Sequence, residues 1–194
     1  MKDLIVLLIL LIIFSGCGNN FDLKKNVTGR QVKLINQDSV EVDYPSIIKD
    51  KVAVIGFIYT NCPDICPMTT HNMQLAEEKL DKDELNKVKF LLITFDPDRD
   101  TPSILTKFAA VREMDMDNWE LVTGSNKNIN TILDQFNVKA IHDDTTYNDK
   151  GLPNYFIIHT DRISLVDESG NLRKNYHGST ASPDELAEDI KSLL

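Results

Sequence analysis

Residues 52–67 read VAVIGFIYTNCPDICP, an apolar run that passes directly into a segment with two cysteines. The run Val52–Tyr59 is rich in β-branched residues, which is typical of a strand buried on both faces of a sheet. Apolar residues then recur at helical spacing over Pro67–Leu80, and Lys89–Phe95 is a second apolar run. This order predicts a βαβ unit, with the cysteines at the carboxyl end of its first strand, where α/β proteins bind ligands.

The same alternation of elements continues on both sides of this unit. Upstream, Gln31–Ile35 and Ser39–Val42 predict a hairpin. Downstream, the sequence predicts helices that begin at Thr101 and Ser125 and a helix capped by Ser182. It predicts strands at Trp119–Val122, Tyr155–Ile158 and Ile163–Val166. A turn at Glu168–Asn171 leads to a further strand, Leu172–Tyr176. The order predicts an α/β domain with a thioredoxin-like fold, a central β-sheet flanked by helices, plus an N-terminal hairpin.

The amino terminus predicts export from the cytoplasm. The apolar run Leu4–Phe14 has 11 residues, whereas a membrane-spanning helix needs about 20, so the run fits a signal peptide. The segment Phe14–Cys17 resembles a bacterial lipoprotein signal, in which cleavage leaves the cysteine as a lipid-modified first residue. We therefore expect a signal peptide at 1–16, a tether at 17–27 and one domain at 28–194, lipid-anchored on the extracytoplasmic face of the membrane. An uncleaved anchor and ordinary secretion are the alternatives.

Composition limits the classes of partner. The 194 residues are 42% hydrophobic, and 21 Lys and Arg against 30 Asp and Glu give a net charge of −9. This composition is typical of one globular domain, and the charge argues against nucleic acid as a partner.

The two internal cysteines have the properties of a reactive pair. A lipidated Cys17 would leave Cys62 and Cys66 as the remaining thiols. Pro67 suits the first position of the following helix, which would place Cys66 at a helix amino terminus, where the thiolate is favoured. A disulfide across so short a loop contributes little stability. The three intervening residues permit a disulfide and also permit both thiolates to bind one soft metal ion.

Two thiolates leave most metal sites incomplete, so a histidine is the expected third ligand. The sequence offers His71, His142, His159 and His177. Spacing does not distinguish these histidines, because any exposed imidazole can titrate or bind a metal ion.

The segment Gly56–Pro67 closely resembles the signature of the Sco/SenC family of copper-binding cytochrome oxidase assembly proteins. Three further blocks agree, namely Phe95–Pro102, Trp119–Gly124, and His159-Thr160 followed by Gly170. The resemblance covers residues 28–194. It implies a thioredoxin-like fold in which Cys62, Cys66 and His159 bind one copper ion, Cu(I) or Cu(II). It also implies that the protein delivers copper to the dinuclear copper centre of cytochrome c oxidase subunit II, or reduces the thiols of that centre.

The sequence departs from this family pattern at two positions. Relatives often have an acidic residue immediately before the histidine, where this chain has Ile158, and an aspartate four positions earlier, where it has Asn154. Such positions orient and tune a ligand, so copper affinity or redox behaviour can differ. Asp64 and the loop Asp96–Asp100 either shape the site, face a partner or are simply solvated turn residues.

Three functions remain open at this point. A metallochaperone would hand over copper by ligand exchange. A thiol-disulfide oxidoreductase would use Cys62 to attack and Cys66 to resolve a mixed disulfide, with a thiol reductant protein as a further partner. A peroxide-reducing enzyme is a third possibility, but the motif has no separate peroxidatic environment. His159 discriminates the first two, because a pure dithiol reductase has no need of a distant imidazole.

Overall fold

The computed structural model describes residue 21, residues 23–147 and residues 153–194, so the expected signal peptide lies outside the described residues. The main sheet contains β1 (Lys25–Asn26), β2 (Val32–Asn36), β3 (Glu41–Tyr44), β4 (Val52–Ile58), β5 (Val88–Thr94), β6 (Trp119–Thr123), β11 (Ile163–Val166) and β12 (Asn171–Tyr176). Its order is β1-β12-β11-β4-β5-β6-β2-β3. The strands β4, β5 and β6 are parallel, and the remaining neighbours are antiparallel.

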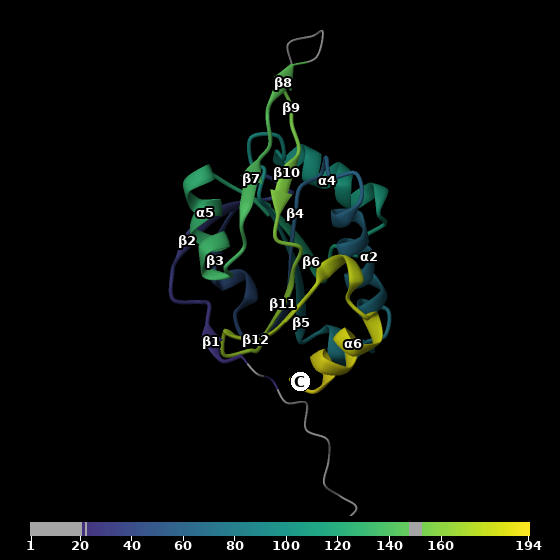
Figure 1. Ribbon diagram of the computed structural model, residues 1–194. Coiled ribbons are helices and arrows are strands. Elements are labelled where there is room, and N and C mark those ends of the chain that lie inside the picture. The colour runs from purple at the N-terminus through teal and green to yellow at the C-terminus, as the bar shows by residue number, and fades with distance from the viewer. Residues whose placement is uncertain (1–20, 22, 148–152) are drawn as a thin grey trace, which may run out of the picture.

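The helices are α2 (Ile65–Glu77), α3 (Lys82–Leu85), α4 (Pro102–Val111), α5 (Asn126–Gln135) and α6 (Pro183–Lys191), with 3-10 turns η1 (Ser46–Ile48) and η2 (Gly178–Thr180). The connections of parallel strands are right-handed, which places α2 and α4 on the same face of the sheet. Figure 1 shows α2, α4 and α6 on one side and α5 on the other. None of the helices within the described ranges is long and apolar enough to cross a membrane.

The core lies around the two central strands. Every residue of β4 is buried, as is every residue of β5 except Lys89, which confirms the prediction that these strands are covered on both faces. The ring of Trp119 stacks on Phe90 with centroids 4.9 Å apart. A Cβ atom on Gly56 would lie 2.7 Å from the sulfur of Met73, so glycine at this position allows α2 to pack closely against β4.

Both ends of the main sheet contain N-terminal strands. The predicted hairpin is confirmed as β2 and β3, and β2 pairs with β6. At the opposite edge, Lys25 of β1 pairs with Leu172 and Asn26 pairs with Asn171. The last residues of the expected tether are therefore part of the sheet.

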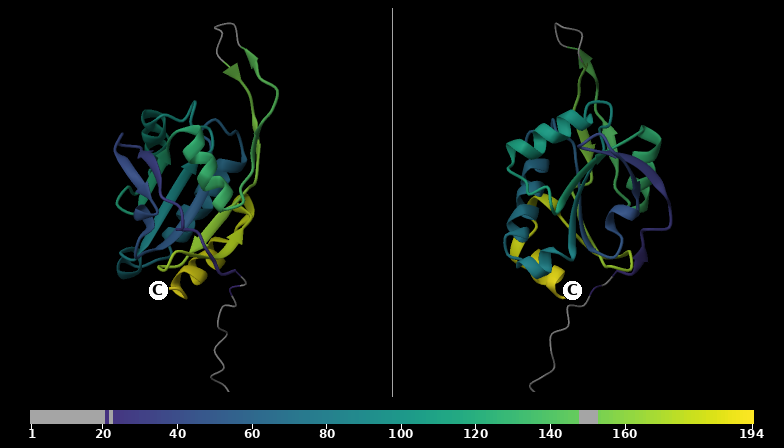
Figure 2. Two further views of the ribbon diagram at one scale, coloured as in Figure 1. Left: turned by 90° about the vertical axis from the view of Figure 1, so that its left-hand side faces the viewer. Right: turned by 180° about the vertical axis from the view of Figure 1, so that it is seen from behind.

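A separate hairpin arm extends from the domain. It consists of β7 (Ala140–His142), β8 (Thr146–Tyr147), β9 (Pro153–Asn154) and β10 (Ile157–His159), which form two small antiparallel sheets, β10-β7 and β8-β9. Figures 1 and 2 show this arm projecting beyond the main sheet. The sequence predicted one strand here, Tyr155–Ile158, whereas the structure places β10 two residues later. His159 is thereby the last residue of a strand, at the base of the arm.

Candidate metal centre

The two cysteines lie where β4 passes into α2. Cys62 is in the connecting loop, and Cys66 is the second residue of the helix, which begins at Ile65. The sequence predicted that Pro67 would be the first helical residue, so the helix begins two residues earlier than expected. A proline is tolerated in the first turn because its missing N–H would have no partner within the helix. The free backbone N–H of Cys66 instead donates to Sγ of Cys62 at 3.4 Å.

His159 completes a compact group with these cysteines. One ligand atom from each of Cys62, Cys66 and His159 can be chosen so that all three lie within 4.8 Å of one another. Nε2 of His159 is 3.8 Å from Sγ of Cys66, and its Nδ1 is 3.1 Å from the carbonyl oxygen of Thr160. Because a carbonyl oxygen only accepts, Nδ1 carries a proton and Nε2 is the ring nitrogen that faces the sulfur atoms. Nε2 donates to Cys62 when the imidazole is protonated, and it offers a lone pair to a metal ion when the imidazole is neutral.

The two thiols have opposite acidities. The thiolate of Cys62 accepts a hydrogen bond from the thiol of Cys66 and another from His159, and these bonds lower the pKa of Cys62 to about 3 against the opposing effect of burial. The same hydrogen bond, together with complete burial, raises the pKa of Cys66. Burial lowers the pKa of His159, but hydrogen bonds to Cys62 and Thr160 outweigh it and raise the pKa. The metal-free pair therefore consists of one thiolate and one thiol, and binding by both sulfur atoms releases the proton of Cys66.

Two buried aromatic rings fix the imidazole. The ring of His159 lies 4.6 Å from that of Phe95 and 6.0 Å from that of Tyr59, measured between centroids. Tyr59 and Phe95 also pack on each other at 5.4 Å. Burial raises the pKa of Tyr59 to about 12, so its hydroxyl group stays neutral beside the thiolate. These contacts limit rotation of the His159 ring.

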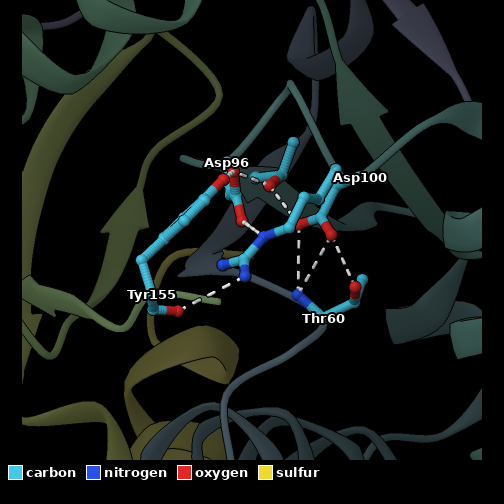
Figure 3. Close-up of polar contacts among 6 residues, drawn as sticks. Thr60, Asp96, Asp100 and Tyr155 are labelled. Atoms are coloured by element: carbon cyan, nitrogen blue, oxygen red, sulfur yellow. Dashed lines mark hydrogen bonds and ion pairs between the residues drawn. The ribbon is translucent and has the colours of Figure 1, made fainter. Parts of the chain in front are cut away.

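A buried carboxylate, that of Asp100, fixes the start of the cysteine loop by hydrogen bonds. Asp100 is fully buried and accepts hydrogen bonds from the backbone N–H of Thr60 at 3.1 Å, from its hydroxyl group at 2.5 Å and from the hydroxyl group of Thr94 (Figure 3). Burial raises the pKa of Asp100, while the hydrogen bonds from Thr60 and Thr94 oppose the increase. Because Thr60 lies two residues before Cys62, these bonds fix the start of the cysteine loop.

A second buried aspartate, Asp96, belongs to the same Asp96–Asp100 loop as Asp100 and fixes the strand that carries His159. Asp96 accepts from the hydroxyl group of Tyr155 at 2.7 Å and pairs with Nε of Arg99 at 2.5 Å (Figure 3). The guanidinium group of Arg99 also lies over the Tyr155 ring, 3.6 Å from its centroid. Tyr155 leads into β10 and His159. The sequence left the role of this loop open, since a run of charged residues around a proline is also typical of a solvated turn.

The other candidate histidines lie outside the group. His71 is exposed on α2, and His142 is exposed on β7, where its ring stacks on Tyr155 at 4.6 Å. His177 is 73% exposed and places Nδ1 2.9 Å from the carboxylate of Asp161. Throughout the ranges that the structure describes, Cys62, Cys66 and His159 are the one group of three His, Cys, Asp or Glu side chains close enough to hold a metal ion.

The two departures from the family pattern lie along the arm. Ile158 is 65% exposed, next to the partly buried His159 in β10. Because neighbouring side chains of a strand point to opposite faces, an acidic residue at position 158 would point away from the cysteines. The backbone of Asn154 pairs with Thr146 in the outer part of the arm.

Comparisons with known proteins agree with this geometry. A family model described as SCO1/SenC matches residues 22–194. The SCO1 protein homolog of Bacillus subtilis (strain 168) is 32% identical over 161 residues, which cover 81% of this chain and 78% of the relative. The solved structure of Bradyrhizobium japonicum ScoI with copper bound is 27% identical and superposes with a TM-score of 0.72, covering 86% of this chain and 99% of that one. The solved structure of BsSco, described as a member of the Sco family of cytochrome c oxidase assembly proteins, is 30% identical with a TM-score of 0.66, covering 89% of this chain and 95% of that one.

Proposed function

Because the chain belongs to the SCO1/SenC family, whose model matches residues 22–194, we propose that it is a copper-binding protein of cytochrome c oxidase assembly. One copper ion would be held by the sulfur atoms of Cys62 and Cys66 and by Nε2 of His159. The observation that carries this proposal is the convergence of these three atoms within 4.8 Å.

The ligand set suits both oxidation states of copper. Thiolates are soft ligands that favour Cu(I), and an added imidazole helps to accommodate Cu(II). Cys62 is already a thiolate in the metal-free protein, because its pKa is lowered to about 3 by hydrogen bonds from Cys66 and His159. The proton of Cys66 must leave when the metal ion binds, as must the Nε2 proton of His159 when the imidazole is protonated.

The proposed recipient is the dinuclear copper centre of cytochrome c oxidase subunit II. Delivery would proceed by ligand exchange, in which thiolates of the recipient replace Cys62 and Cys66 in turn. The partial exposure of Cys62 supports this route, since an incoming ligand can approach its sulfur atom from solvent. The similarity to BsSco, a member of the Sco family of cytochrome c oxidase assembly proteins, supports the assignment to oxidase assembly.

Copper titration of the full-length protein, with its dithiol reduced, tests the proposal. We expect one copper ion per chain and, with Cu(II), a sulfur-to-copper charge-transfer band that disappears when the dithiol is oxidised. The double variant Cys62→Ser, Cys66→Ser should lose the band and the tight binding. Copper binding that is undiminished in the double variant would overturn the assignment.

A thiol-disulfide oxidoreductase is the second candidate, favoured by the low pKa of Cys62 beside a protonated Cys66. This pairing suits a nucleophile and a resolving thiol, which could prepare the recipient's cysteines for copper. The copper-free reduced protein would then reduce a disulfide in the copper-binding domain of subunit II. Rates that are equal for wild type and His159→Ala, combined with normal oxidase assembly in the variant, would favour this candidate over copper delivery.

We further propose that the domain is held at the extracytoplasmic face of the membrane by a lipid on Cys17. Residues 1–16 would be removed as a signal peptide, and the expected tether at 17–27 would connect the lipid to the functional domain at 28–194, with its last residues already paired in the main sheet as β1. The support is the short apolar run that ends near a cysteine among small residues.

A further inference from the structure

Asp161 is an acidic residue whose side chain is largely buried beside the proposed site. Its side chain is 7% exposed. The carboxylate accepts hydrogen bonds from Oγ1 of Thr69 at 3.1 Å, from the backbone N–H of Ser179 at 2.9 Å and from Oγ of Ser179 at 2.6 Å. Three donors directed at one carboxyl group are typical of its ionised form.

These contacts place the carboxylate between the elements that carry two of the proposed ligands. Asp161 follows His159 by two residues, and Thr69 follows Cys66 by three residues on α2. The neighbouring Gly178 makes the approach possible, since a Cβ atom on Gly178 would lie only 2.5 Å from Oδ1 of Asp161. The packing of η2 therefore fixes the carboxylate beside the site.

The charge of Asp161 has no strong counter-charge. Among the residues that the structure describes, no Lys or Arg forms an ion pair with it, and its one titratable partner is the exposed imidazole of His177. The hydrogen bond to Cys62 and burial raise the pKa of Cys66 most, and the Asp161 charge adds to them. At His159, burial lowers the pKa, whereas hydrogen bonds to Cys62 and Thr160 raise it, and the Asp161 charge again adds to the increase. Because Asp161 follows His159 by two residues and its carboxylate accepts from Thr69, three residues after Cys66, the charge lies close to both proposed ligands.

We propose that Asp161 tunes the proposed copper site, because its fixed negative charge favours Cu(II) over Cu(I). This inference rests on the proposed function. Two thiolates and Cu(II) are together neutral, whereas the same ligands with Cu(I) carry one negative charge. Adding one electron beside a buried anion is opposed by Coulomb repulsion, which is only weakly screened away from solvent. Asp161 thus places an acidic group beside the proposed copper site, whereas an acidic residue at the exposed position 158 would point away from it.

The test compares Asp161→Asn with wild type in the copper-loaded full-length protein. Asparagine has nearly the same shape but no charge. In a spectroelectrochemical titration with a dye mediator as the one-electron donor, the preference for Cu(II) over Cu(I) should fall about tenfold, which is a rise of about 59 mV for a one-electron couple. Asp144→Asn, at an exposed position of the arm, removes the same net charge and should leave the potential unchanged. Equal potentials for wild type and Asp161→Asn would overturn the inference.

A second pair of variants keeps the inference testable if Asp161→Asn does not fold. His177 is exposed, so His177→Lys places a permanent cation beside the carboxylate without disturbing the core, and His177→Gln is the neutral control. The lysine variant should raise the potential relative to the glutamine variant, and equal potentials in this pair would count against the inference. If wild type itself binds no copper, the proposed function fails. If wild type binds copper and neither comparison changes the potential, the role of Asp161 alone fails.

Discussion

Nε2 of His159 lies 3.8 Å from Sγ of Cys66, although 93 residues of sequence separate them. The helix α2 holds the cysteine, and the last residue of β10 is the histidine. The residue after the histidine is fixed as well, because the backbone N–H of Thr160 donates to the carbonyl oxygen of Lys139 at 2.9 Å, and the N–H of Lys139 donates to Oγ1 of Thr160 at 3.0 Å. The ligand group therefore exists only in the folded chain.

Replacing His159 by alanine should weaken Cu(II) binding by about 100-fold or more, since even the loss of a residue that only supports a metal ligand costs 10- to 100-fold. Both thiols stay in place, so the disulfide should still form and be reduced. Isothermal titration with Cu(II) measures the affinity, and an oxidase assembly assay in cells measures the function.

Three alanine variants control this experiment, at His71, His142 and His177, all of which lie outside the group. Each should bind copper with an affinity within about tenfold of wild type, because none removes a proposed ligand. If one of these variants loses copper binding while His159→Ala behaves as wild type, the wrong imidazole has been assigned.

The acidity of Cys62 predicts unusual reactivity at low pH. Its pKa is lowered to about 3 by hydrogen bonds from Cys66 and His159, so the reactive thiolate persists until the pH approaches that value. Its alkylation by iodoacetamide, followed by peptide mass spectrometry, should be nearly constant between pH 8 and pH 5. The rate for an ordinary thiol falls about tenfold per pH unit over this range.

The variant Cys66→Ala supplies the control, because it removes the thiol that donates to Cys62. The pKa of Cys62 should rise, and alkylation at pH 5 should slow. The lowered pKa of Cys62 also determines how the stability of the reduced protein changes with pH. A lowered folded-state pKa stabilises the reduced protein above the ordinary value of 9.0, and this contribution is lost as the pH falls toward about 3. Alkylation of Cys62 that slows in wild type from pH 8 downward would contradict the assignment.

Removing the buried carboxylate of Asp100 should destabilise the fold. Asp100→Ala leaves the N–H and hydroxyl groups of Thr60 without their partner, and we expect the free energy of unfolding to fall by about 2–4 kcal/mol. Asp100→Asn keeps an acceptor oxygen and should lose less. Urea denaturation monitored by the fluorescence of Trp119 provides the measurement.

The difference in stability between wild type and Asp100→Asn should depend on pH. Burial raises the pKa of Asp100, so the protonated form is favoured in the folded state. This contribution is complete below the ordinary value of 3.8 and is lost as the pH rises through the folded-state pKa. The stability of wild type relative to Asp100→Asn should therefore decrease as the pH rises from about 4 toward neutrality. A difference that increases over this range would contradict the raised pKa of Asp100.

The proposed anchor is tested by Cys17→Ala. The variant lacks the sulfur atom to which a lipid would be attached, so we expect it to be misprocessed or released from the membrane. Cell fractionation and immunoblotting measure the distribution, with Cys62→Ala as a matched cysteine variant that should stay with the membrane. A Cys17→Ala product that is processed normally and remains membrane-bound would contradict the lipid anchor.

Local patterns in the sequence predicted the central elements well. The apolar runs at 52–59 and 89–95 correspond to β4 and β5 within one residue at either end, because a strand buried on both faces needs a continuous apolar run. The predicted caps are also present, since Ser125 accepts from the N–H of Asn128 and Ser182 accepts from that of Glu185.

The hairpin arm and the buried aspartates could not be predicted in this way. The strands β7 and β8 are mostly exposed and only two or three residues long, so they leave no periodic pattern. Asp96 and Asp100 are charged residues in a turn-like run, and their burial depends on Thr60 and Tyr155, which lie far away in the sequence. His159 joins the cysteines through the same long-range packing, which is why spacing could not separate it from the other histidines.

The unequal exposure of the two sulfur atoms imposes an order on events at the pair. Cys66 is completely buried, whereas Cys62 is partly exposed in the loop before α2. A colliding molecule, whether it brings a thiol, an electrophile or another ligand, meets the sulfur of Cys62 and has no route to Cys66 without local opening of the helix start. The sulfur of Cys62 is therefore the atom at which an incoming group first reacts with the pair, and it is also the last contact of a group that leaves.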